Sequence, residues 1–222
     1  MRKLLLFSAM VVAAGLAPAA TAAASPSMQA APTAQQLLAK TTSCKQVSNG
    51  KYKTDDETGR TIAVCDAGSA VFWKADMDID CDGQPTARCN KNTDPWFQDG
   101  TAYPRSDGKA LIADQTPYVV VPSISGTWNF EKAGLKGAGS CAVIYNDKVL
   151  YTVIGDTGPK DIIGEASYAA AKALGINPDP KNGGVDSGVT YICFKNSKVS
   201  PIEDNGKSAS VGQALATKFV QG

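Results

Sequence analysis

The stretch Ala75-Asp76-Met77-Asp78-Ile79-Asp80-Cys81-Asp82-Gly83 alternates acidic and apolar residues. Successive side chains of a β-strand point to opposite faces of the sheet. The alternation therefore predicts a strand with the carboxylates of Asp76, Asp78 and Asp80 on one face and apolar side chains on the other. Adjacent carboxylates repel one another unless a cation lies beside them, and that cation can be a metal ion or a charged substrate. A merely solvated acidic strand is the alternative.

The same stretch has a partial match to a calcium motif. Asp78-x-Asp80-x-Asp82-Gly83 follows the start of an EF-hand loop, but Cys89 stands at the twelfth position, where the loop needs Glu. No flanking helices are apparent. We therefore assign no metal ligands and expect no cofactor, and a calcium-stabilised domain without catalysis stays an alternative.

Short strands are predicted outward from this stretch. Runs rich in Val, Ile, Tyr or Phe, bounded by Gly, Asn, Asp or Pro, span residues 61–65, 70–74, 118–121, 141–145, 149–154 and 189–195. Helices are predicted at 33–42, with Thr33 as N-cap, at 166–174, ended by Gly175, and at 210–220. The fold class is mainly β (α+β), a single compact barrel-like domain with a few helices.

The N-terminus has the order of a secretory signal peptide. Arg2 and Lys3 precede an apolar run to about Leu16, and small residues with A-x-A cleavage sites follow up to residue 24. The apolar run is short for a membrane span of about 20 residues. We expect residues 1–24 to be removed, 25–42 to form a leader and short helix, and 43–222 to form the main domain. The protein would be extracellular and would not contact a membrane after cleavage.

Six cysteines follow the cleavage site, and export to an oxidising compartment predicts that they form disulfides. No C-x-x-C pair indicates a redox or metal site. Fifteen pairings of six cysteines exist, and we favour a short Cys81–Cys89 loop and a Cys141–Cys193 bridge between strands.

Composition excludes several function classes. The 222 residues hold 22 Lys and Arg against 21 Asp and Glu, which argues against a nucleic-acid partner. There is no histidine. Catalytic systems that pair Ser or Cys with His are therefore excluded, and so are zinc sites that need imidazole. An enzyme of this composition would work with carboxylates.

One pair of carboxylates has suitable spacing. Asp156 follows the apolar run 149–154 and is predicted at the strand's end, and Glu165 lies nine residues later at the start of the Ala-rich helix. Such a pair can flank one bound molecule, as glycoside hydrolysis requires. Asp156 could instead only close a turn, and Glu165 could only interact with the helix dipole. An aspartic peptidase would need two Asp-Thr-Gly segments, and this chain has one, at Asp156.

Trp96 is the best exposed aromatic candidate for stacking on a sugar ring. The preceding Asn92-Thr93-Asp94-Pro95 is typical of a surface loop.

Three stretches together resemble the fungal-type chitosanases of glycoside hydrolase family 75, whose members also occur in bacteria. They are residues 75–83, Ala142-Val143-Ile144-Tyr145, and 151–167. The resemblance covers the chain from about Ser43 to the C-terminus. It implies internal cleavage of the β-1,4 bonds of chitosan with inversion, and it implies that Asp156 and Glu165 are the essential carboxylates.

The resemblance names chitosan and chitooligosaccharides as partners. Chitosan is a polycation, so Asp76, Asp78 and Asp80 would attract its amines, and we expect Trp96 to join them in substrate binding. We expect a monomer, with Glu165 as general acid and Asp156 as general base. A secreted carbohydrate-binding domain without catalysis is the other alternative.

Overall fold

The structure, a computed structural model, describes residues 30–222, so the predicted signal peptide and the start of the leader lie outside the described residues. The helices of this range are α1 (Ala34–Ala39), α2 (Tyr168–Leu174) and α3 (Asn205–Gln221). The strands are β1 (Lys45–Gln46), β2 (Cys65–Asp66), β3 (Ala70–Asp80), β4 (Tyr118–Pro122), β5 (Ser140–Tyr145), β6 (Lys148–Gly158), β7 (Glu165–Ser167) and β8 (Val185–Phe194).

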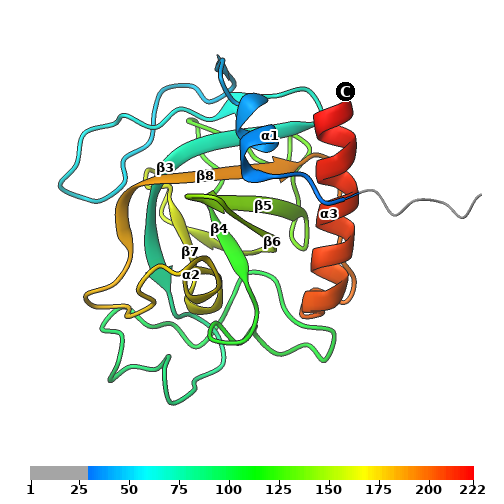
Figure 1. The fold of residues 1–222 in the computed structure, drawn as a ribbon. Coiled ribbons are helices and arrows are strands. Elements are labelled where there is room, and N and C mark those ends of the chain that lie inside the picture. Colours follow the sequence, from blue (N-terminus) through cyan, green and yellow to red (C-terminus); the bar gives the residue numbers. More distant parts are fainter. Residues whose placement is uncertain (1–29) are drawn as a thin grey trace, which may run out of the picture. The chain divides into compact units, whose positions relative to one another are not determined.

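These strands form one sheet in the order β1-β2-β3-β7-β4-β6-β5-β8. β3 also pairs with β8, so the six strands from β3 to β8 close into a barrel (Figure 1). A closed barrel leaves no free edges among these six strands. The predicted mainly β, barrel-like domain with a few helices is confirmed.

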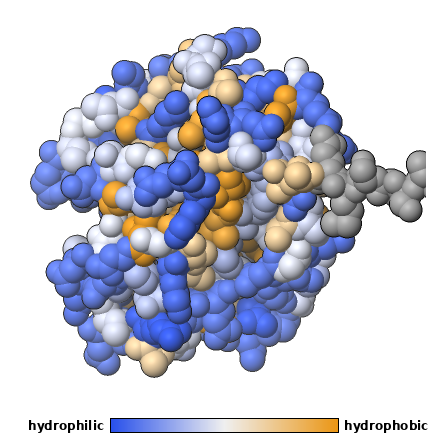
Figure 2. All heavy atoms as spheres, viewed as in Figure 1, coloured by the Kyte–Doolittle hydropathy of each residue, from blue (hydrophilic) through white to orange (hydrophobic). Residues whose placement is uncertain are grey.

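Alternation along β3 explains the two main parts of the core. Val71, Trp73 and Met77 are buried inside the barrel, where Trp73 stacks on Tyr191 with ring centroids 5.2 Å apart. Phe72 points to the outer face, which α1 and α3 cover. In Figure 1, α3 runs along one side of the barrel. Figure 2 shows hydrophilic residues over most of the visible face, with apolar residues between the loops near its centre.

All six cysteines are paired. The predicted bridges Cys81–Cys89 and Cys141–Cys193 are confirmed, and Cys44–Cys65 is the third. Over residues 30–222, no helix is both long enough and apolar enough to cross a bilayer.

The structure corrects two local predictions around the carboxylate pair. β6 continues through Asp156 to Gly158, so Asp156 lies within a strand rather than in a turn after one. Glu165 belongs to β7, and α2 begins only at Tyr168, with Ser167 as its N-cap. The helix therefore starts two residues later than the predicted start at residue 166. The residues between belong to the short strand β7, which pairs with β3 and β4.

Candidate active site

The sheet brings Asp156 and Glu165 to one face. Glu165 on β7 pairs with Val120 on β4, and Val120 pairs with Asp156 on β6. Ala166, next to Glu165, is buried in the barrel core, and so is Ile154 on β6. Because side chains alternate along a strand, Glu165 faces outward. Asp156 faces outward as well, through an irregularity in β6, so the two side chains lie on either side of Val120.

A bulge in β6 gives Asp156 this orientation. The register between β4 and β6 shifts, so that Val119 pairs with Ile154 and Val120 pairs with Asp156. Gly155 is the extra residue. In a regular register Gly155 would pair with Val120, and Asp156 would take the inward position, because a shift of one residue exchanges the two faces of a strand. Bulges re-orient side chains beside active sites in this way.

Asp156 is nearly buried and is held by backbone donors. It is 7% exposed. Its Oδ1 accepts hydrogen bonds from the backbone N–H groups of Ala102 at 2.8 Å and Thr157 at 2.7 Å. Burial raises the pKa of Asp156, and these two hydrogen bonds oppose the rise. The donors stabilise the ionised form, which a general base needs.

Glu165 is surrounded by like charges. Burial, followed by the charges of Asp78, Asp82 and Asp156, raises the pKa of Glu165 to about 8. A carboxyl group with this pKa carries a proton near neutral pH, as a general acid must.

A pocket of about 360 Å³ opens beside Glu165. It is acidic and carries one exposed indole, since Trp96 is 83% exposed, as predicted. The residues that line the pocket are Asp78, Ile79, Asp80, Cys81, Asp82, Asp94, Trp96, Glu165, Pro180, Lys181 and Gly183.

The pocket thus combines four of the predicted site residues: Asp78, Asp80, Trp96 and Glu165. Asp156 does not line it, although its charge raises the pKa of Glu165. The alternation of β3 is as predicted, and Asp76 shares the outer face, but it lies outside this pocket.

Asp82 and Asp94 complete the acidic lining and were not predicted as site residues. Asp82 Oδ1 accepts from Gln98 N at 2.6 Å, and Asp94 Oδ1 accepts from Trp96 N at 2.9 Å. Asp82 is the last acidic residue of the alternating stretch 75–83, so the same spacing could have predicted it as a site residue. Asp94 has only a turn signal, which says nothing about a pocket.

The EF-hand alternative is wrong for this chain. Asp78 and Asp80 belong to strand β3, and Cys89 is bonded to Cys81. An EF-hand needs a flexible loop between two helices.

The comparisons with known proteins identify the family of this chain. The profile of the family described as fungal chitosanase of glycosyl hydrolase group 75 matches residues 77–221. Endo-chitosanase C of Aspergillus oryzae is 33% identical over 135 residues, covering 59% of this chain and 33% of that protein. Endo-chitosanase B of Aspergillus oryzae (strain ATCC 42149 / RIB 40) is 30% identical over 169 residues, covering 68% of each. Endo-chitosanase of Aspergillus fumigatus is 29% identical over 172 residues, covering 71% of this chain and 72% of that protein.

The chain thus spans a third of the length of one of these relatives and about two thirds or more of the other two. The family match extends from the acidic strand to the last helix and includes Asp156 and Glu165. The chain belongs to the fungal chitosanase family, glycosyl hydrolase group 75.

Proposed function

We propose that this protein is a secreted endo-chitosanase that hydrolyses β-1,4 glucosaminide bonds of chitosan with inversion. The observation that carries the proposal is the outward pair Asp156 and Glu165, which flanks Val120 next to an acidic pocket. The relatives named above as endo-chitosanases support the same reaction. Three disulfides fit an oxidising compartment and so support secretion of residues 43–222 as the catalytic domain.

The spacing of the two strands that carry the pair allows the carboxyl separation of an inverting enzyme. Asp156 and Glu165 lie two strands apart at one register position. Their backbones are therefore about 9.5 Å apart, which is twice the usual strand spacing. An inverting pair needs carboxyl groups roughly 6.5–9.5 Å apart, so that a water fits beside the sugar.

The reaction follows from the two environments. Glu165 gives its proton to the glycosidic oxygen as the bond from that oxygen to the anomeric carbon breaks. Asp156 takes a proton from a water, whose oxygen forms the new bond to the anomeric carbon from the opposite face. The raised pKa of Glu165 and the two backbone donors on Asp156 favour these roles over the reverse assignment.

Recognition of chitosan relies on charge. Asp78 and Asp80 line the pocket with Glu165, and a glucosamine ammonium group would place a positive charge beside these carboxyl groups. Trp96 would stack on a neighbouring sugar ring. The protein as a whole is close to neutral, so the attraction is local. One chain holds the whole site, which supports action as a monomer.

The experiment is reducing-sugar release from chitosans of graded acetylation. Asp156→Asn and Glu165→Gln should each remove almost all turnover, while the exposed controls Asp147→Asn and Glu57→Gln keep it. Substantial turnover in a folded Asp156 or Glu165 variant removes that residue from the mechanism. Binding of chitosan without any reducing-end release by the unaltered protein would favour the carbohydrate-binding alternative.

The two roles are separated with an aryl chitooligosaccharide, whose leaving group needs little protonation. Glu165→Ala should regain much of its activity on this substrate, and Asp156→Ala should not. Recovery in Asp156→Ala alone would reverse the assignment.

A further inference from the structure

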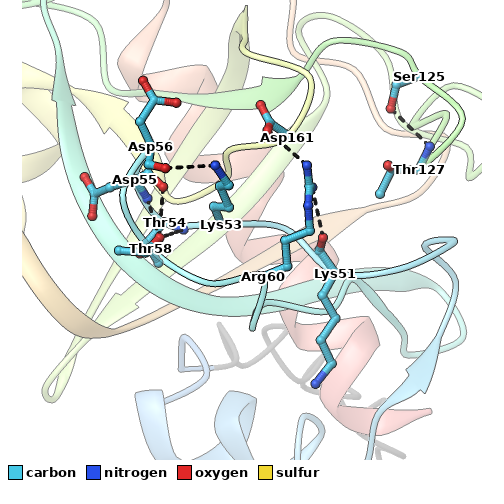
Figure 3. A network of polar contacts seen from close by, with 10 residues as sticks. All are labelled: Lys51, Lys53, Thr54, Asp55, Asp56, Thr58, Arg60, Ser125, Thr127 and Asp161. Carbon is cyan, nitrogen blue, oxygen red and sulfur yellow. Dashed lines mark hydrogen bonds and ion pairs between the residues drawn. The ribbon is translucent and has the colours of Figure 1, made fainter.

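A second acidic cluster lies on the outer face of β3 and shares Asp78 with the pocket beside Glu165. Asp55, Asp76 and Asp78 each offer one carboxylate oxygen, and these oxygens lie within 4.8 Å of one another. Asp55 comes from the loop 51–60, far from β3 in the sequence. Figure 3 shows this loop, in which the Thr58 hydroxyl bonds to both ends of the Asp55 backbone.

Asp76 is the unusual member of the cluster. Its side chain is nearly buried, with the residue 4% exposed, and its Oδ1 has no hydrogen-bond partner in the described structure. Gly164 lies directly against this oxygen, so that any side chain there would displace it. A buried carboxyl oxygen without a donor is costly, because it has lost its hydration without a replacement.

Two cationic side chains of the loop 51–60, those of Lys53 and Arg60, bind groups outside the cluster. Lys53 donates its Nζ hydrogen bond to the backbone carbonyl of Asp56 at 2.8 Å, and Arg60 pairs with Asp161 at 3.0 Å (Figure 3). The charges that act on Asp76 come from carboxylates, those of Asp78, Asp55 and Glu165. Lys74 lines a pocket with Asp76, but among residues 30–222 no Lys or Arg forms an ion pair with any of the three carboxylates.

We propose that Asp55, Asp76 and Asp78 bind a divalent cation of the calcium type. Calcium takes oxygen ligands at about 2.3–2.6 Å, so two of its ligands can be up to about 5 Å apart. Oxygens within 4.8 Å of one another are close enough to share such an ion. The sequence allows a metal ion beside Asp76 and Asp78, but it does not indicate Asp55, because Asp55 lies in a polar loop and nothing local predicts that it meets β3.

The site has a structural consequence. The ion attaches the loop 51–60 to β3 at Asp78, which pairs in register with the catalytic Glu165. It also accounts for Asp76, which is on the acidic face but outside the substrate pocket. Asp78 belongs both to the proposed cation site and to the pocket beside Glu165, whereas Asp80 belongs only to the pocket.

The test is thermal unfolding in chelator-treated buffer, with CaCl2 or NaCl of equal ionic strength and without chitosan. CaCl2 should raise the unfolding midpoint by about 5 °C at saturation, because an ion that binds only the folded state stabilises it. Asp55→Asn should lose this rise. That variant will fold, because Asp55 is exposed and its carboxylate makes no hydrogen bond in the described structure. Asp56→Asn, the adjacent exposed residue, should keep the rise.

Terbium gives a second readout. The Tyr191 hydroxyl donates to the Asp76 carbonyl at 2.9 Å, so Tb³⁺ bound at the cluster should show luminescence excited through this ring, and CaCl2 should quench it by competition. An equal midpoint rise with NaCl, or a rise that survives in Asp55→Asn, would overturn the site. Stabilisation by glucosamine but not by CaCl2 would also overturn it and assign the cluster to substrate. Loss of chitosan hydrolysis alone tests the proposed function and leaves metal binding independently measurable.

Discussion

Gly158 on β6 makes room for Glu165 from two strands away. A Cβ atom at Gly158 would lie 3.1 Å from Glu165 Oε2 and 3.1 Å from Val120 Cγ1. The Glu165 carboxylate therefore reaches over Val120 toward β6, the strand that holds Asp156. The absence of a side chain at Gly158 leaves room for the Glu165 carboxyl group on the face that it shares with Asp156.

Gly158→Ala should lower kcat by roughly tenfold or more, since small displacements of a catalytic group are costly. Its effect on stability should be small, because only the flexible end of Glu165 and one methyl group need to move. The matched control is Gly126→Ala, where the added methyl group meets nothing within 4 Å. Kinetics on chitosan and the unfolding midpoint are compared for both, and an unchanged kcat in Gly158→Ala would mean that Glu165 does not act from this position.

The charge of Asp82 contributes to the raised pKa of Glu165. Asp82→Asn removes that charge and keeps the Oδ1 acceptor for Gln98 N. The pKa of Glu165 should then fall, so Glu165 loses its proton at lower pH. The basic limb of the kcat/KM profile should move to lower pH. Asp99→Asn, an exposed change of equal charge, should leave the limb in place, and a limb that moves upward in Asp82→Asn would contradict Glu165 as the acid.

At the scale of elements, the three-residue strand β7 positions Glu165 and also prepares α2. Ser167 is fully buried. Its hydroxyl accepts from Tyr118 N at 3.0 Å and from Ala170 N at 3.2 Å, and it donates to the Thr116 carbonyl at 2.9 Å. One side chain thus joins β4, β7 and the N-terminus of α2.

Ser167→Ala should lower the free energy of unfolding by about 2–4 kcal/mol, because it leaves buried backbone groups unpaired. Thr33→Ala is the comparison, since Thr33 caps the exposed start of α1 and its loss should cost about 1 kcal/mol. Denaturant unfolding of the two variants measures the difference. Equal losses would show that the hydroxyl of Ser167 acts only as a helix cap.

The sequence predicts the elements whose signals are local. The alternation of β3, the Gly175 C-cap and the paired apolar runs of β5 and β6 all specify structure within about ten residues. The strand β7 was missed because three residues carry no period, and its pairing with β3 depends on residues 87 positions away. The bulge at Gly155 was missed for the same reason, since it exists only relative to β4.

The candidate site shows the same limit. The pair Asp156 and Glu165 could be chosen from spacing and resemblance, but their shared face follows from the register with Val120. Asp55 and Asp94 reach the acidic face from loops, and loop conformation is set by tertiary contacts that composition does not contain.

At the scale of the whole molecule, acidic groups are concentrated on one side of a nearly neutral protein. Burial is the main cause that raises the pKa of Asp76 to about 8 and the pKa values of Asp78 and Asp82 to about 6. Glu165 reaches about 8. This concentration of acids lowers stability wherever the groups are ionised, and function requires that cost: a cationic polymer needs an acidic surface, and an acid catalyst needs a carboxyl group that keeps its proton.

The sign of the resulting pH dependence follows from the direction of these shifts. A carboxyl group whose pKa is raised by folding binds its proton more tightly in the folded state. Its stabilising contribution is complete below the unfolded pKa of about 4 and is lost as pH rises through the folded value. The free energy of unfolding should therefore fall from pH 4 toward pH 8, first through Asp78 and Asp82 and then through Asp76 and Glu165. Unfolding midpoints measured in chelator across this range check the trend.

Glu165→Gln supplies the decisive comparison, because glutamine has nearly the same shape and no charge to bury. At pH 8 the variant should unfold at a higher temperature than the unaltered protein, by several degrees, since each kcal/mol changes the midpoint by roughly 2–4 °C in a domain of this size. At pH 4.5 the two midpoints should nearly coincide. Glu165 is then protonated in the folded protein and also in a large fraction of the unfolded molecules. The exposed Glu57→Gln control should give no such difference at either pH. A Glu165→Gln midpoint below that of the unaltered protein at pH 8 would mean that an ionised Glu165 stabilises the fold, which is incompatible with its role as the protonated acid.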